Sequence, residues 1–256
     1  MSTASSLSEW FATPQGQYVL TREQSVFDSS VADIFGFNAV QLGLPECDFL
    51  RISRIPFHIK AGKETGVHLW LEAEELPFET GSIDLVVLPH VLEFSAHPHQ
   101  ILREVERVLR PEGSIIISGF NPLSLWGMRR ALWQKKEYPW CGKFISVLRI
   151  KDWLALLGFE VESGRFTCYA PPFAGSALLK RSQFSEASGN RWWSVIGGVY
   201  FVQARKRVPG MRVIKPNWNG RLVRKLLPAS AKLNKEINTP ASFVAHWNGH
   251  SGKENE

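Results

Sequence analysis

The stretch from residue 72 to residue 120 constrains the fold more than any other part of the chain. Residues 83–88 form a nearly continuous apolar run rich in β-branched side chains, as expected of a parallel strand covered on both faces. Residues 101–110 place their apolar side chains on one helical face, and residues 114–120 predict a second buried strand. These segments predict one βαβ unit, whose two strands are parallel and joined by a right-handed crossover.

The end of the predicted helix is marked by Pro111 and Gly113, which are poor continuations of a helix. Glu106 and Arg110 would then lie four residues apart on the helix, a spacing that suits an ion pair. The helix is therefore expected to extend at least to Arg110.

Three short motifs within this stretch carry a resemblance to a known family. They are E-A-E-E-L-P-F at 72–78, S-I-D at 82–84, and L-R-E-V-E-R-V-L-R-P-E-G at 102–113. Their order resembles that of class I S-adenosylmethionine-dependent methyltransferases of the type 11-like group, most closely the small-molecule branch that includes quinone-biosynthesis methyltransferases. The pattern in that branch reads roughly D-A-x-x-L-P-F, then F-D, then E-x-x-R-V-L-K-P-G-G. Glu112 stands at the first glycine of the last motif.

The resemblance implies an α/β fold with a Rossmann-like seven-stranded sheet, mostly parallel with an antiparallel last strand, and flanking helices. Residues 1–207 are expected to form this methyltransferase-like domain, with residues 1–36 as an N-terminal helical extension. Residues 208–256 are expected to form a basic, disordered tail. The last strand, at 199–204, is expected beside its predecessor at 159–169.

Several further elements are expected from local patterns. Thr21 with Gln24 resembles a capping box ahead of a helix that Gly36 ends, with a buried stripe of Val26, Phe27, Val31, Ile34 and Phe35. A helix at 151–157 ends at Gly158, residues 176–184 suggest another, and residues 185–190 suggest a loop.

The family's first strand and glycine-rich loop correspond to residues 37–47 of this chain. A loop of the form D-x-G-x-G-x-G keeps small residues where the backbone approaches the cofactor. This sequence has Gln41, Gly43, Pro45 and Cys47 at those positions. Residues 51–60 suggest the next strand but end without the acidic residue that holds the ribose hydroxyls in the family. Two interpretations follow: a rebuilt loop that still binds cofactor, or a degenerate half that only packs.

The later strands offer better-matched site residues. By resemblance, Glu72 accepts a hydrogen bond from the adenine amine and Ala73 offers its backbone N–H at the ring edge. Leu88, Pro89 and His90 follow the fourth strand at its carboxyl end, where open parallel sheets bind ligands. With Gly43, these five residues are the expected cofactor contacts. Glu74, Glu75 and Glu79 are expected to be solvated.

His90 is the candidate catalytic residue, since its imidazole could accept a proton from a substrate hydroxyl or amine. The alternative is a hydrogen-bonded structural histidine. Glu93 and His97 would join it in a metal site only if this short stretch were helical, and no metal is expected. Aromatic residues after the fifth strand suggest either a cap packed on the sheet or a lid over a hydrophobic or anionic substrate: Trp126, Trp133, Tyr138, Trp140 and Phe144.

The net charge of +6 is concentrated near the end of the chain. Residues 205–235 hold ten Lys or Arg and no acid, whereas residues 1–204 hold 19 basic and 21 acidic side chains. The segment Arg205–Lys235 is either solvated or binds a nucleic acid or an anionic surface. Three cysteines without C-x-x-C spacing suggest reduced thiols. No apolar run approaches the ~20 residues of a transmembrane helix, and the polar start lacks signal-peptide features, so a cytoplasmic location is expected.

The expected activity is transfer of a methyl group from S-adenosylmethionine to an unidentified, small and hydrophobic acceptor. Two alternatives come from other functional classes. One is a non-catalytic methyltransferase-like scaffold, and the other is a nucleic-acid-binding protein that uses its basic tail.

Overall fold

The computed structural model of the chain describes residue 4 and residues 6–132, 137–172 and 197–208. The chain divides into two compact units, Met1–Gly210 and Met211–Glu256. Every described residue belongs to the first unit, so the expectations for residues 176–190, Trp133 and the tail beyond Val208 lie outside the described residues.

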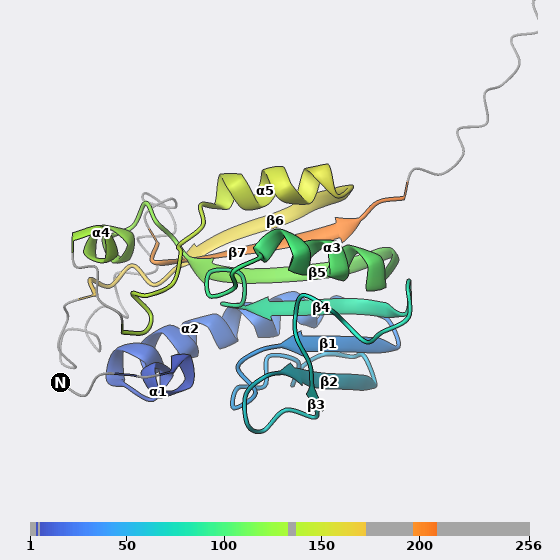
Figure 1. Ribbon diagram of the computed structural model, residues 1–256, viewed down its shortest axis with the longest axis horizontal. Helices are drawn as coiled ribbons and strands as arrows, with labels where there is room; N and C mark the ends of the chain where they lie inside the picture. Colours follow the sequence, from blue (N-terminus) through green and yellow to red (C-terminus); the bar gives the residue numbers. More distant parts are fainter. Residues whose placement is uncertain (1–3, 5, 133–136, 173–196, 209–256) are drawn as a thin grey trace, which may run out of the picture. The chain divides into compact units, whose positions relative to one another are not determined.

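Within the described residues, a seven-stranded sheet forms the centre of the fold (Figure 1). Its strands are β1 (Asn38–Leu42), β2 (Phe57–Gly62), β3 (Leu69–Trp70), β4 (Ile83–Pro89), β5 (Leu109–Phe120), β6 (Phe159–Thr167) and β7 (Val199–Lys206). They are ordered β3-β2-β1-β4-β5-β7-β6. All pairs from β3 to β5 are parallel, and β7 runs antiparallel to both β5 and β6. The predicted parallel βαβ unit and the antiparallel last strand are confirmed.

Helices cover both faces of this sheet. The described helices are α1 (Leu7–Phe11), α2 (Pro14–Val31), α3 (Pro98–Val108), α4 (Leu125–Leu132) and α5 (Val147–Leu156). Helices α3 and α5 pack on one face and α2 packs on the other, while α1 and α4 lie near the edge at which β1, β4 and β5 end (Figure 1). No helix among the described residues has both the length and the apolar character that crossing a membrane requires.

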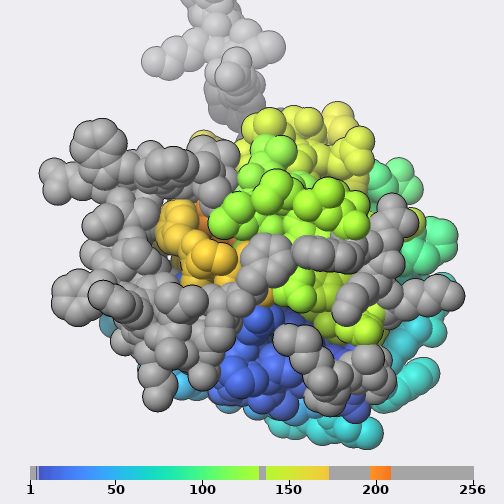
Figure 2. All heavy atoms as spheres, turned by 90° about the vertical axis from the view of Figure 1, so that its left-hand side faces the viewer, coloured from blue at the N-terminus to red at the C-terminus, as the bar shows by residue number. Residues whose placement is uncertain are grey.

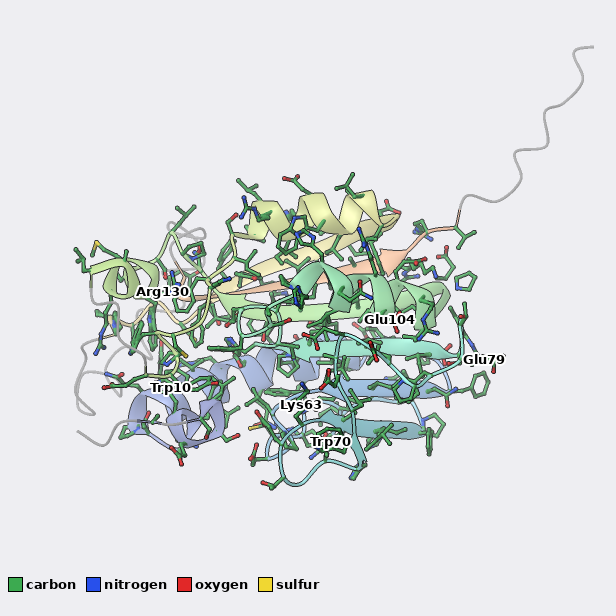
Figure 3. The ribbon with its side chains drawn as sticks, viewed as in Figure 1. Trp10, Lys63, Trp70, Glu79, Glu104 and Arg130 are labelled. Carbon is green, nitrogen blue, oxygen red and sulfur yellow. The ribbon has the colours of Figure 1, made fainter. Side chains whose placement is uncertain are left out.

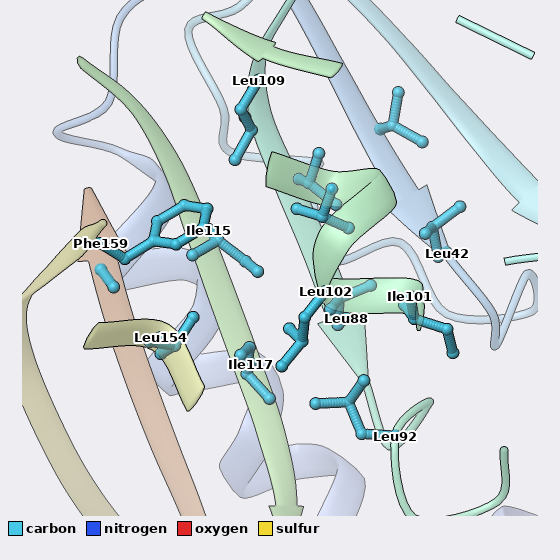
Figure 4. Packing of buried hydrophobic residues seen from close by; sticks show 14 of the residues in the cluster. Leu42, Leu88, Leu92, Ile101, Leu102, Leu109, Ile115, Ile117, Leu154 and Phe159 are labelled. Atoms are coloured by element: carbon cyan, nitrogen blue, oxygen red, sulfur yellow. The ribbon is translucent and has the colours of Figure 1, made fainter. Parts of the chain in front are cut away.

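The apolar strands β4 and β5 supply both hydrophobic layers. Leu88 and Ile115 lie on the face that α3 and α5 cover (Figure 4), whereas Leu85 and Ile116 lie on the face that α2 covers. Successive side chains of a strand alternate between faces, so a sheet covered on both sides needs apolar residues throughout. Full burial of each such side chain contributes about 1.5–3 kcal/mol.

The N-terminal helix differs from its predicted form. α2 begins at Pro14 rather than near Thr21, because Thr13 caps it by accepting a hydrogen bond from the Gly16 N–H at 3.1 Å. The Thr21 hydroxyl instead donates to the Gln17 carbonyl within the helix. The capping-box prediction was therefore wrong. α2 also ends at Val31, before Gly36, and leaves Phe35 exposed.

The predicted extent of the crossover helix was also wrong. α3 ends at Val108, and β5 begins at once with Leu109. Arg110 therefore lies in a strand, where its guanidinium pairs with Asp84 of β4 at 3.2 Å. Glu106 pairs with Lys206 of β7 at 2.8 Å in place of the expected helical partner.

Candidate functional site

A cavity of about 340 Å³ lies at the carboxyl ends of β1 to β4. Residues at or just after the end of each strand line the cavity. In strand order they are Gly43 and Leu44, Lys63 and Glu64, Ala73 and Glu74, and Pro89 to Val91. Ser6, Leu7 and Tyr138 line it as well. Figure 2 views the molecule from this edge, where α1 and the segment around α4 gather. Open parallel sheets bind ligands at this edge.

The loop after β1 is organised by the side chain of Gln41. This amide is fully buried. Its Nε2 lies 3.0 Å from the Leu44 carbonyl and 2.8 Å from the Cys47 carbonyl, and its Oε1 accepts from the Phe49 N–H at 3.0 Å. A side-chain amide thus satisfies backbone groups that would otherwise be buried without partners. The loop holds a defined shape although it lacks two of the family's three glycines.

Gly43 is a glycine of the loop whose backbone lines the cavity. Its φ of 79° lies in the left-handed region that favours glycine, and a Cβ there would lie 3.2 Å from Val91 Cγ2. The Gly43 N–H donates to the Ala61 carbonyl of β2 at 2.8 Å. Gly43 is therefore fixed between the ends of β1, β2 and β4.

Glu64 is the cavity residue that the sequence analysis missed. β2 ends at Gly62 rather than at Lys60, which places Glu64 two residues beyond the strand. Its half-buried carboxylate lies 3.5 Å from the Ser8 hydroxyl of α1. Burial and the nearby Glu46 raise the pKa of Glu64 above its usual range. A carboxylate therefore does follow β2, contrary to the expectation that this strand end lacks one.

In the segment after β3, the acidic residue that lines the cavity is not the one that was predicted. Ala73 and Glu74 line the cavity, and Glu74 accepts from the Ser95 hydroxyl at 2.7 Å. Glu72 is half-exposed outside the lining and pairs with Lys63 at 2.8 Å (Lys63 is labelled in Figure 3). The expectation that Glu74 is merely solvated was wrong, because it is held in the cavity wall.

Two of the recognised motifs contact each other. Arg107 of α3 donates to the Leu76 carbonyl at 2.8 Å and to the Phe78 carbonyl at 2.9 Å. Glu104, one turn earlier, accepts from the Leu76 N–H at 3.1 Å and pairs with Arg107 at 2.8 Å. The E-x-x-R motif thus clamps the L-P-F loop that follows the cavity residues of the β3 segment.

His90 lies inside the protein between two carboxylates. Its Nδ1 lies 2.6 Å from Glu93 Oε1, and its Nε2 is hydrogen-bonded to Glu23 of α2. All three side chains are almost completely shielded from solvent. His90 also has a φ of 54°, uncommon for a residue with a side chain. The turn after β4 is therefore held in a left-handed conformation by an anchored imidazole.

The two carboxylates raise the pKa of His90 to about 10 against the opposing effect of burial, so the ring is an imidazolium at neutral pH. Burial also raises the pKa of Glu93 above its usual range. An imidazolium with both nitrogens donating has no lone pair for a substrate proton. The geometry thus favours the structural alternative for His90, and its role as a base stays a prediction.

Comparison with known proteins relates part of the sequence and the fold to methyltransferases. Residues 59–117 match a family model described as a methyltransferase domain. The fold is similar to that of an S-adenosylmethionine-dependent methyltransferase from Thermotoga maritima, described as a possible histamine N-methyltransferase. That structure has a TM-score of 0.53 and 16% identity, with 74% of this chain and 93% of that chain covered. The chain thus carries a segment that matches a methyltransferase domain, and its fold is that of class I S-adenosylmethionine-dependent methyltransferases.

Two relatives in sequence extend the comparison. The uncharacterized protein YafS of Escherichia coli (strain K12) is 28% identical over 77% of this chain and 80% of its own length. A malonyl-[acyl-carrier protein] O-methyltransferase of Methylovorus sp. (strain MP688) is 33% identical over 35% of this chain. The shared part is only 30% of that relative's length.

The fold brings four of the six predicted cofactor residues to one cavity, namely Gly43, Ala73, Pro89 and His90. Leu88 is buried in the core on the α3 face, and Glu72 lies outside the lining. No group of three or more His, Cys, Asp or Glu residues in the described part of the chain is arranged to hold a metal ion.

The aromatic residues after β5 pack on one another beside α1. Trp126 stacks on Phe120 with ring centroids 5.9 Å apart and on Trp140 at 5.8 Å. Trp10 of α1 meets Trp126 edge to face at 6.0 Å. Trp126 is fully buried, and its Nε1 donates to the Ala170 carbonyl at 3.0 Å. In the described residues, this segment therefore matches the interpretation as a packed cap.

Proposed function

We propose that this methyltransferase binds S-adenosylmethionine in the 340 Å³ cavity and transfers its methyl group to a small-molecule acceptor. The observation that carries the proposal is the meeting of four strand ends at one cavity, with Glu64 at the end of β2. Loss of the family's glycines does not remove this cavity, because Gln41 holds the altered loop in shape.

The chemistry of the lining fits the cofactor. Glu64 can accept hydrogen bonds from the ribose diol, and the backbone at Gly43 lies open to the methionine end. Ala73 and Leu71 give a small, apolar wall suited to a flat adenine ring. Besides the internally paired His90, the lining carries two carboxylates, Glu64 and Glu74, and one ammonium, Lys63. This excess of negative charge favours a ligand with a positive sulfonium.

The bound cofactor supplies a methyl group that is already activated by its attachment to a sulfonium. The residues of the chain have to hold the donor, exclude water and orient the acceptor, which is the main source of rate enhancement for such a step. Anchoring His90 to α2 and clamping residues 76–78 to α3 give the cavity walls the rigidity that this alignment needs.

Binding of S-adenosylhomocysteine, measured by isothermal titration calorimetry, tests the proposal. Glu64→Gln is expected to weaken binding by about tenfold, since a charge-assisted hydrogen bond is worth about 1.5–3 kcal/mol. Glu79→Gln is the matched control, because Glu79 is exposed at the opposite edge of the sheet from Trp10 (Figure 3). Absence of both heat and thermal shift at millimolar ligand would leave the non-catalytic scaffold as the better interpretation.

A second proposal, binding of a nucleic acid or an anionic surface by the basic segment Arg205–Lys235, concerns only the cations after Arg207. Lys206 pairs with Glu106 at 2.8 Å, Arg205 with Glu162 at 2.6 Å, and Arg207 with Glu160 at 2.8 Å. These three cations therefore belong to the folded unit. Binding of nucleic acid or of an anionic surface through the remaining cations, up to Lys235, stays a prediction. Electrophoretic shift of RNA and DNA by the full chain and by a chain ending at Arg207 tests it.

A further inference from the structure

A second cavity, of about 420 Å³, lies beside the first. Its walls come from residues 92–99 after β4, from Pro122 after β5, and from residues 143–153 at the start of α5. Ser95 lines both cavities. The segment that follows β4 therefore separates the two cavities and contributes to both.

The charged side chains of this second cavity are all of one sign. Lys143 and Arg149 line it, with His99 as a further potential cation, and its lining contains no acidic residue. In the described part of the chain, neither the Lys143 ammonium nor the Arg149 guanidinium has an ion pair. Arg107 and Arg110, by contrast, are each paired with a carboxylate. A concave surface with cations of one sign concentrates anions.

The frame that carries these cations is fixed by the fold. The Lys143 N–H donates to the Glu93 carbonyl at 2.7 Å, so this residue is tied to the turn that His90 anchors. Ser146 caps α5, whose first turn contains Arg149, and the helix N-terminus adds a positive partial charge. The His99 ring lies against the Trp153 ring with centroids 3.8 Å apart. The cavity thus joins cationic groups to an aromatic wall.

We propose that the second cavity binds the anionic group, a carboxylate or a phosphate, of the methyl acceptor. The inference rests on the proposed function, because it takes the first cavity as the site of the methyl donor. A lid over a hydrophobic or anionic substrate was one of two expectations for the segment after β5. Of the two substrate classes, the basic lining favours the anionic one. The Trp153 and Phe144 side chains in the same lining can contact an apolar part of the acceptor attached to the charged group.

Titration of succinate and of phosphate into the protein saturated with S-adenosylhomocysteine tests the proposal, at constant ionic strength so that screening does not change. At least one of the two anions is expected to bind at millimolar concentration, whereas succinamide, the neutral analogue of succinate, is expected not to bind. Arg149→Gln and Lys143→Gln are each expected to weaken anion binding at least about tenfold, the loss expected for one charge-assisted hydrogen bond. Preference for succinate or for phosphate identifies the carboxylate or the phosphate class.

Arg103→Gln is the matched control, because it removes an equally exposed positive charge from α3 outside the cavity lining. Equal anion affinity in the wild type, in both cavity variants and in this control would overturn the proposal, as would binding of neither anion. Retained S-adenosylhomocysteine binding in those cases would leave the proposed function standing. Two cavity variants are used so that a folding defect in one, visible in its thermal unfolding, leaves the other decisive.

Discussion

Glu23 and His90 lie 67 residues apart in the chain but share a hydrogen bond in the protein interior, where both side chains are fully shielded from solvent. The bond connects α2, on one face of the sheet, to the turn that follows β4 at the candidate cofactor site. Two charged groups are buried at low cost only when each has a partner, and Glu93 completes the arrangement as the second partner of the imidazole. The N-terminal helix is thus built into the support of the site.

Replacing Glu23 by Ala should destabilise the protein strongly. The change leaves the His90 imidazolium with one carboxylate and opens a polar void, and breaking a buried ion pair costs about 3–5 kcal/mol. Urea denaturation measures the loss. Glu79→Ala, at an exposed position, should stay within about 0.5 kcal/mol of the wild type. A loss at Glu23 no larger than that at Glu79 would contradict the buried pair.

Stability should fall as pH rises from 6.5 towards 10. The pKa of His90 is raised from 6.5 to about 10, so the folded state holds a proton that the unfolded state releases. A raised pKa stabilises the folded state fully below pH 6.5, and this stabilisation is lost progressively as the pH rises towards 10. The raised pKa of Glu93 acts in the same direction from pH 4.5 upward.

Glu23→Gln separates this effect from other titrations. The variant keeps the size of the side chain but removes one of the two charges that raise the pKa of His90. Its stability should therefore fall less between pH 6.5 and 10 than that of the wild type, as followed by urea denaturation midpoints across the range. The same fall in both proteins would show that His90 and Glu23 are not coupled.

The βαβ unit could be predicted because its signals are local and agree with one another. The apolar run at 83–88, the amphipathic helix and the second apolar run each specify their own element. Because both strands are apolar at nearly every position, their sequences also predict burial on both faces of the sheet. The error at Arg110 arose because the pattern could not show that β5 starts at Leu109. Tertiary pairing of Arg110 with Asp84 overrides the helical spacing.

The cofactor wall was harder to predict because two of its features depend on register and on distant contacts. A shift of two residues in the end of β2 moved Glu64 to the position that had been expected to lack an acid. The sequence did not show that Gln41 holds the loop after β1 in shape. Its four hydrogen-bond partners are backbone groups that only the fold brings together. For His90, the sequence showed Glu93 nearby but not Glu23.

Gly43→Ala should weaken cofactor binding more than an equivalent substitution elsewhere. Gly43 and Gly81 both have positive φ values, of 79° and 66°, so a Cβ at either should cost about 1–2 kcal/mol of stability. Only at Gly43 does the Cβ meet a neighbour, Val91 Cγ2 at 3.2 Å, beside the cavity. Calorimetric titration with S-adenosylhomocysteine should show weaker binding for Gly43→Ala and unchanged binding for Gly81→Ala. Similar affinities in the two variants would remove Gly43 from the site.

Arg107→Ala should loosen the segment that follows β3 while leaving the sheet intact. Its guanidinium holds the carbonyls of Leu76 and Phe78, and hydrogen bonds from a charged donor contribute about 1.5–3 kcal/mol when shielded. Because the side chain is partly exposed, a loss of about 1–3 kcal/mol in urea denaturation is expected.

The effect on binding should follow from the same contacts, since Ala73 and Glu74 of this segment line the cavity. S-adenosylhomocysteine should bind several-fold more weakly to Arg107→Ala, with hydrogen exchange accelerated at the amides of residues 72–78. Arg103→Ala provides the comparison, because it removes an exposed arginine from the same helix but leaves the contacts of Arg107 with Leu76 and Phe78 in place. If both variants exchange and bind alike, the contacts of Arg107 contribute nothing to the site, and the order of residues 72–78 must come from their other contacts, such as the Glu74–Ser95 hydrogen bond and the packing of Leu76.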